Sequence, residues 1–226
     1  MSWLQSLYAS TIGKKAVMAI TGLIIFGFTL GHMAGNLLAF FGEDTFNTYA
    51  ATIKGNPPLL WGTRLLLLTV IPLHFLTAFQ LIKRSNDARP ATYSKWQPQR
   101  STYASRTIRF GGIYLLGFIL YHLAHYTLFL TNPEFGEYHD AQGRHDAFRM
   151  VVEGFSNPVN VAVYLVAMLS LVFHLSHGAW SMFQSMGLNH PKYNQLRERA
   201  AWTLAIVLTV GFSSVPIAVL TGVVHR

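Results

Sequence analysis

The chain has 226 residues, of which 51% are hydrophobic and 12% charged, whereas a soluble domain carries about 25% charged residues. It contains no cysteine, which excludes disulfides, thiolate-ligated zinc and iron–sulfur clusters held by this chain. The formal charge of +8 would suit nucleic acid, but the basic residues lie between long apolar runs, so we expect a lipid bilayer and no nucleic acid as partner.

Five apolar runs are each long enough to cross about 30 Å of hydrocarbon. In chain order they cover residues 16–41, 59–82, 110–130, 158–183 and 201–224. The first run follows Lys14 and Lys15 and is too long for a signal-peptide core, so we expect it to remain as a span. The sequence therefore predicts an all-α integral membrane protein with five transmembrane helices and one membrane domain over residues 1–226.

The loops between the runs predict the orientation. Basic residues concentrate on the N-terminal side of the predicted membrane, which receives 12 of the 17: Lys14, Lys15, Lys83, Arg84, Arg89, Lys95, Arg100, Arg106, Arg109, Lys192, Arg197 and Arg199. By the positive-inside rule this side is cytoplasmic. On the opposite, outer side, the spacing of apolar residues predicts a short amphipathic helix over 44–54. The polar loop 131–155 has a possible helix in its second half.

Six of the ten histidines fall inside the predicted spans: His32, His74, His122, His125, His174 and His177. Ionisable residues inside a membrane are rare and usually functional. A single such histidine could equally be a neutral packing residue. Four spans that each hold one or two histidines make that interpretation much less favourable, and they indicate a buried cofactor or proton site.

The depth of these histidines predicts how they pair. His32 and His122 lie in the outer halves of two outward-running helices, whereas His74 and His174 lie in the inner halves of two inward-running helices. Two imidazoles at equal depth can bind the iron of one haem from opposite sides within a four-helix core. The two levels should differ by about 10–15 Å. The sequence thus predicts two stacked haem b groups, the outer on His32 and His122 and the inner on His74 and His174.

Several other residues are secondary candidates. Gly27, Gly31 and Gly35 form a ridge beside His32 that could admit a flat macrocycle or, equally, a neighbouring helix. His125 and His177 lie one turn from His122 and His174; they could ligate, but hydrogen bonding to propionates or quinone, or lining a polar pocket, is the better interpretation. Arg106 and Arg109 could meet the inner haem's propionates or could simply be topogenic charge.

At these residues the chain resembles the cytochrome b558-type membrane anchor of succinate:quinone oxidoreductases, the single-chain, five-helix, di-haem class. The segments that carry the resemblance are Leu30-Gly31-His32, Pro72-Leu73-His74, Tyr121-His122-Leu123 and, most specifically, Phe173-His174-Leu175-Ser176-His177-Gly178-Ala179-Trp180. The resemblance spans essentially the whole chain. It implies that His32, His74, His122 and His174 are the haem axial ligands, in the same two pairs.

The resemblance also implies partners and a location. These are a flavoprotein subunit and an iron–sulfur subunit on the cytoplasmic side of a bacterial inner membrane, a membrane quinone that is usually menaquinone, and in some relatives a trimer of whole complexes. Some fumarate reductases of this kind place a glutamate two residues before the last ligand. Here that position is Val172, which favours succinate oxidation over fumarate reduction.

Two alternatives stay open from the sequence. The chain could be the di-haem cytochrome b subunit of another membrane oxidoreductase, of the hydrogenase or formate dehydrogenase type, which differs in its catalytic partner. It could also be a transporter whose intramembrane histidines relay protons or bind a metal. A reduced-minus-oxidised spectrum separates the transporter from both cytochromes.

Overall fold

The computed structural model describes residues 3–88 and 101–226. The predicted basic residues Arg89, Lys95 and Arg100 lie outside this part of the chain. The described residues are almost entirely helical, in the order α1 (Trp3–Ala9), α2 (Thr11–Leu37), η1 (Leu38–Phe41), α3 (Glu43–Lys54), α4 (Pro57–Asp87), α5 (Tyr103–Tyr126), η2 (Pro133–Glu137), α6 (Ala147–Ser156), α7 (Pro158–Ser185) and α8 (Pro191–Leu220).

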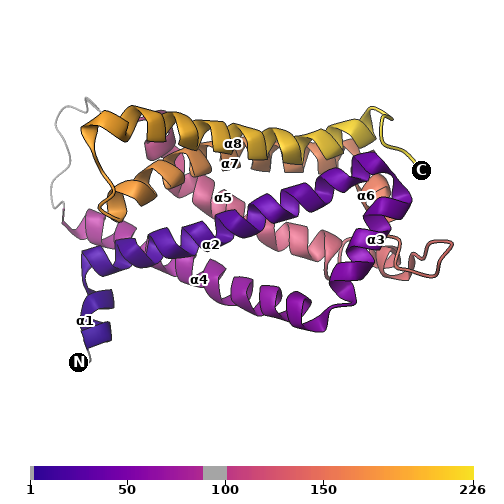
Figure 1. Cartoon of the computed structure of the whole chain (residues 1–226), viewed down its shortest axis with the longest axis horizontal. Coiled ribbons are helices and arrows are strands. Elements are labelled where there is room, and N and C mark those ends of the chain that lie inside the picture. The colour runs from indigo at the N-terminus through magenta and orange to yellow at the C-terminus, as the bar shows by residue number, and fades with distance from the viewer. Residues whose placement is uncertain (1–2, 89–100) are drawn as a thin grey trace.

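Five of these helices are long and apolar enough to span a membrane, which confirms the predicted fold class. In Figure 1, α2, α5 and α8 run in one direction and α4 and α7 in the other, with the chain termini at opposite ends of the bundle. We call the end that holds α1 and the start of α8 the inner end, and the end that holds α3 and α6 the outer end. Helix α4 packs on α2, α5 packs on α7, and α7 packs on α8, which also contacts α2.

The helix starts follow from local sequence. Ser10, Asn56, Thr102 and Asn157 each accept a hydrogen bond from a backbone N–H in the first turn of the helix that follows. Such caps satisfy donors that have no partner within the helix. Proline begins α4, α7 and α8, where its missing N–H is harmless.

Two helices end earlier than hydropathy predicts, both at the outer end. Helix α5 ends at Tyr126 rather than at residue 130, and α8 ends at Leu220 rather than at 224. The first candidate span does end at Phe41, and its last turn is the 3₁₀ helix η1. Some of the apolar residues beyond these ends pack into the outer end instead of continuing a span. Phe129 takes a positive φ of 54° and its ring lies 5.8 Å from that of His145, and Val224 is buried.

These residues belong to a compact outer cap, formed by η1, α3, residues 127–146, α6 and the C-terminus. The predicted helix over 44–54 is present as α3, and the second half of the polar loop contains α6. Phe135, Phe148 and Phe155 are buried together in this cap. The cap therefore covers the outer end of the bundle with an apolar cluster, although the sequence of loop 131–155 is polar overall.

A buried polar network fixes the cap. The Asn47 amide donates to Asp146 Oδ1 at 3.0 Å, and Asn47 Oδ1 accepts from the Phe148 N–H at 2.9 Å. Arg144 bridges Asp140 and Asp44 through its guanidinium. Desolvation opposes ionisation of Asp140, but hydrogen bonds from Arg144 and Gln142 outweigh it and hold the pKa of this carboxyl below its usual value. The ionised network thus ties α3 to the loop before α6.

Candidate functional site

Two histidine pairs lie inside the bundle. The ring centroids of His32 on α2 and His122 on α5 are 5.8 Å apart. Those of His74 on α4 and His174 on α7 are 6.4 Å apart. The structure therefore brings together the same two pairs of residues that the sequence predicts from their equal depth in the membrane.

The spacing within each pair fits one metal ion between two imidazoles. A metal–imidazole bond is about 2.0–2.1 Å long, so two imidazoles on opposite sides of a metal have ring centroids about 6 Å apart. In residues 3–88 and 101–226, no group of three or more His, Cys, Asp or Glu side chains could hold a metal ion. A structural zinc site takes four protein ligands and a catalytic one three. Two imidazoles alone suit haem, whose macrocycle supplies the other ligands.

Contacts between helices give the separation of the two levels. Thr21 contacts His74, and it precedes His32 on α2 by 11 residues, which is about 16 Å along a helix. Tyr164 contacts His122, and it precedes His174 on α7 by 10 residues, or about 15 Å. Two helices thus give nearly the same distance along the bundle between the pairs, at or just above the upper limit of the predicted 10–15 Å.

At the inner pair, the Thr21 hydroxyl contacts His74. It lies 2.8 Å from the backbone oxygen of Val17, 3.1 Å from that of Met18 and 2.9 Å from His74 Nδ1. A hydroxyl has one hydrogen to donate and lone pairs that accept, so when it donates to its own helix it accepts from the Nδ1–H of His74. That tautomer leaves the Nε2 lone pair available to bind a metal.

At the outer pair, the Tyr164 hydroxyl lies between two imidazoles. It is 3.2 Å from His122 Nδ1 and 3.3 Å from His125 Nδ1. A hydroxyl has one hydrogen to donate and lone pairs that accept, so Tyr164 can accept from one histidine while it donates to the other. This contact again uses Nδ1 of the predicted ligand.

The remaining member of each pair is held differently. His32 stacks on Phe28 and lies near Phe212, and its Nε2 is 3.4 Å from the Asn36 amide. That amide bonds more closely to the His32 backbone oxygen, at 2.7 Å, so the ring contact is the weaker of the two. His174 Nδ1 is buried and has no hydrogen-bond partner among the described residues.

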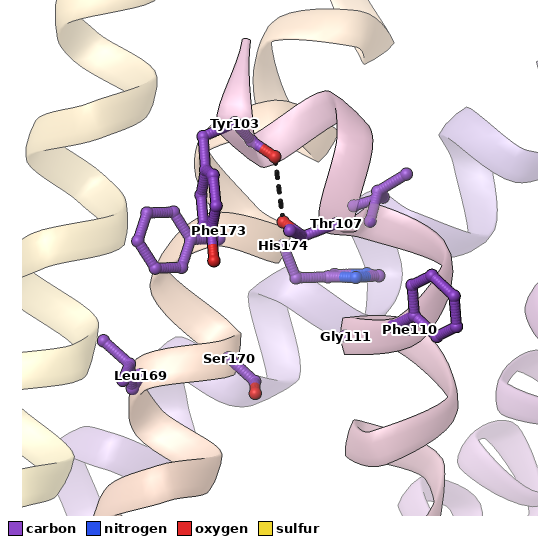
Figure 2. A pocket seen from close by; sticks show the side chains of 9 residues that line it. Tyr103, Thr107, Phe110, Gly111, Leu169, Ser170, Phe173 and His174 are labelled. Carbon is purple, nitrogen blue, oxygen red and sulfur yellow. Dashed lines mark hydrogen bonds between the residues drawn. The ribbon is translucent and has the colours of Figure 1, made fainter.

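A small pocket adjoins His174 between α5 and α7. Figure 2 shows the His174 imidazole reaching from α7 toward α5 near Gly111, with Tyr103, Thr107 and Ser170 around the same space. The pocket volume is about 190 Å³, below the 300–1,000 Å³ typical of small-molecule sites.

The predicted glycine ridge divides into two parts. A Cβ at Gly27 or Gly31 would meet no atom within 4 Å, whereas a Cβ at Gly35 would lie 2.5 Å from the Tyr49 hydroxyl. Gly35 thus allows α3 to pack on α2. No atom of the described residues would lie within 4 Å of a Cβ at Gly27 or Gly31, so neither glycine packs against another helix of this chain, and the approach of a flat ligand there stays a prediction.

The secondary candidates lie in different surroundings. His125 is completely buried and stacks on Tyr126 with centroids 4.0 Å apart. His177 is partly buried on α7, one turn beyond His174. Arg106 and Arg109 are exposed at the inner end, and Arg109 donates to Asn86 at 3.2 Å, which links α5 to α4.

Sequence reasoning missed Thr21 and Tyr164. Threonine and tyrosine are common in membrane helices, so neither residue stands out by type. The depth argument could have found both, because Thr21 lies at the level of the inner histidines and Tyr164 at the level of the outer ones.

A model of the family described as succinate dehydrogenase/fumarate reductase transmembrane subunit matches residues 83–213, more than half of the chain. The match includes His122 and His174 and begins after His32 and His74. No curated protein and no solved structure matches the chain.

Proposed function

Since the chain belongs to the family of succinate dehydrogenase/fumarate reductase transmembrane subunits, we propose that it is the di-haem cytochrome b anchor of a succinate:quinone oxidoreductase. In this role it passes electrons between an iron–sulfur subunit and a membrane quinone, which the b558 resemblance implies is menaquinone. The single observation that carries the proposal is the presence of two facing histidine pairs at two levels of one helical bundle.

Each pair would hold one haem b. When bound, haem supplies a one-electron carrier whose potential the protein tunes. The residues of the chain position the ligands: Thr21 orients His74, and Tyr164 contacts His122. The outer cap shields the outer pair from water on its side of the membrane, and the open backbone at Gly27 and Gly31 leaves room beside His32.

The catalytic partners would dock at the inner end. Lys83, Arg84 and Lys192 are exposed there, and basic residues favour the cytoplasmic side. We therefore place the flavoprotein and iron–sulfur subunits on this face, in a bacterial cytoplasmic membrane. The family match favours such partners over those of a hydrogenase or formate dehydrogenase. The absence of a third metal ligand at either pair, within the described residues, argues against a metal transporter.

Single histidine variants of the purified complex test the pairing. His32→Ala and His122→Ala should each lose one haem and leave the same residual absorbance spectrum. His74→Ala and His174→Ala should leave the other spectrum, because removal of one axial ligand releases the haem that the pair shares. His177→Ala serves as a matched control, since it lies one turn from a ligand and should retain both haems. A different grouping, such as His32 with His74, would contradict the proposal.

A further inference from the structure

Tyr164 connects two buried histidines of unlike surroundings. His122 faces His32 across the outer site, whereas His125 faces no other histidine and lies under the cap, against Tyr126 and Phe135. The hydroxyl lies within 3.3 Å of Nδ1 on both rings. This three-residue chain of hydrogen bonds has two possible directions, and each direction sets the tautomer of both histidines.

Metal binding at His122 would select one direction. An imidazole that binds a metal through Nε2 carries its proton on Nδ1, so His122 must donate to the Tyr164 oxygen. The hydroxyl hydrogen of Tyr164 then has one acceptor within reach among the described residues, His125 Nδ1. Donation to it places the His125 proton on Nε2, an atom that is buried and has no partner among the described residues.

We propose that Tyr164 is a positioning residue that holds His122 as an iron ligand, and that His125 is the terminal acceptor of this directed chain rather than a ligand. The proposal rests on the proposed function and assigns a role to a histidine that sequence leaves open. It also separates the two sites. The inner tautomer is set by a threonine bound to its own helix, whereas the outer one is set through a side-chain network that extends into the cap.

The chain should affect the outer site measurably. A hydrogen bond accepted from the distal ring N–H raises the basicity of a metal-binding histidine, which stabilises ferric over ferrous iron. Tyr164 is the stronger acceptor because it also donates to His125, since hydrogen bonds in a chain polarise one another. Loss of the hydroxyl should therefore raise the potential of the outer haem. If loss of the hydroxyl weakens the preference of the outer site for ferric iron tenfold, the potential of the outer haem rises by about 59 mV for this one-electron couple.

Spectroelectrochemical titration of both haems in the purified complex tests the proposal with Tyr164→Phe. We expect the outer potential to rise and the inner potential to stay unchanged. Tyr121→Phe is the matched control. The Tyr121 ring lies near those of His125 and Tyr164, but its hydroxyl donates to Asn160 at 3.0 Å and bonds neither histidine. A Tyr164→Phe complex with an unchanged outer potential, or with only the inner one shifted, would overturn the proposal.

A second variant, His125→Gln, decides the matter if Tyr164→Phe fails to assemble. Both haems should remain, and the outer potential should rise by less than it does in Tyr164→Phe, because the hydroxyl is still present. Loss of a haem would make His125 a ligand, and an unchanged potential would remove it from the chain; either result refutes the assignment. If the unmodified complex contains no haem, the proposed function itself fails, which is a separate outcome.

Discussion

Single hydroxyl groups contact Nδ1 of one histidine in each pair. At the inner pair, the Thr21 hydroxyl accepts from His74 Nδ1 when it donates to its own helix. Under the proposed function, this contact would leave Nε2 of His74 available for the haem iron. The histidine pairs could be predicted by counting residues from the ends of the spans. The hydroxyl partners could not be predicted from residue type, because their roles depend on contacts between helices.

Thr21→Val removes this acceptor while it keeps the shape of the side chain. We expect the inner haem to be retained about tenfold less tightly, in line with the 10–100-fold cost of losing such partners. The outer haem should be unaffected. Haem release to an excess of apomyoglobin measures the retention. Thr29→Val is the control, since the Thr29 hydroxyl bonds only the Ile25 backbone oxygen of the same helix; equal loss of haem in both variants would contradict the role of Thr21.

At the scale of elements, hydropathy predicts five spans and misplaces the outer ends of two of them, α5 and α8. A hydropathy run records apolar side chains without distinguishing burial in lipid from burial in protein. Phe129 and Val224 extend their runs although both serve the cap. Likewise, loop 131–155 appears polar in the sequence because its apolar residues are scattered along it. They form a buried cluster only where α3 and α6 pack together.

Asn47 joins α3 to the segment before α6, so its loss should loosen the cap. Asn47→Ala leaves the buried Phe148 N–H without its partner, at a cost of about 1–3 kcal/mol. We expect tryptic cleavage at Arg144 in the detergent-purified complex to accelerate about tenfold or more, since 1.4 kcal/mol is a factor of ten. The control is Thr52→Ala, which removes an exposed hydroxyl bonded only to its own helix. A cleavage rate equal to that of the control would show that Asn47 does not fasten the cap.

At the scale of the whole molecule, the orientation in the membrane rests on the distribution of basic residues. The chain contains no cysteine, so single cysteines can be placed without background. Ala141 is exposed in the outer cap and Gln195 is exposed at the inner end, so Ala141→Cys and Gln195→Cys place one thiol on each side. In intact spheroplasts, a membrane-impermeant maleimide should label the first only, and the second should react after the membrane is dissolved in denaturing detergent. Labelling of Gln195→Cys in intact cells would reverse the orientation.

The family and the five-helix bundle make this chain the membrane subunit of a succinate dehydrogenase or fumarate reductase, and we propose that its paired imidazoles hold haems that carry electrons. A pyridine haemochrome assay on the purified native complex, normalised to the amount of this chain, tests that claim most directly. We predict two haem b per chain. A complex that contains this chain but no haem would contradict the account.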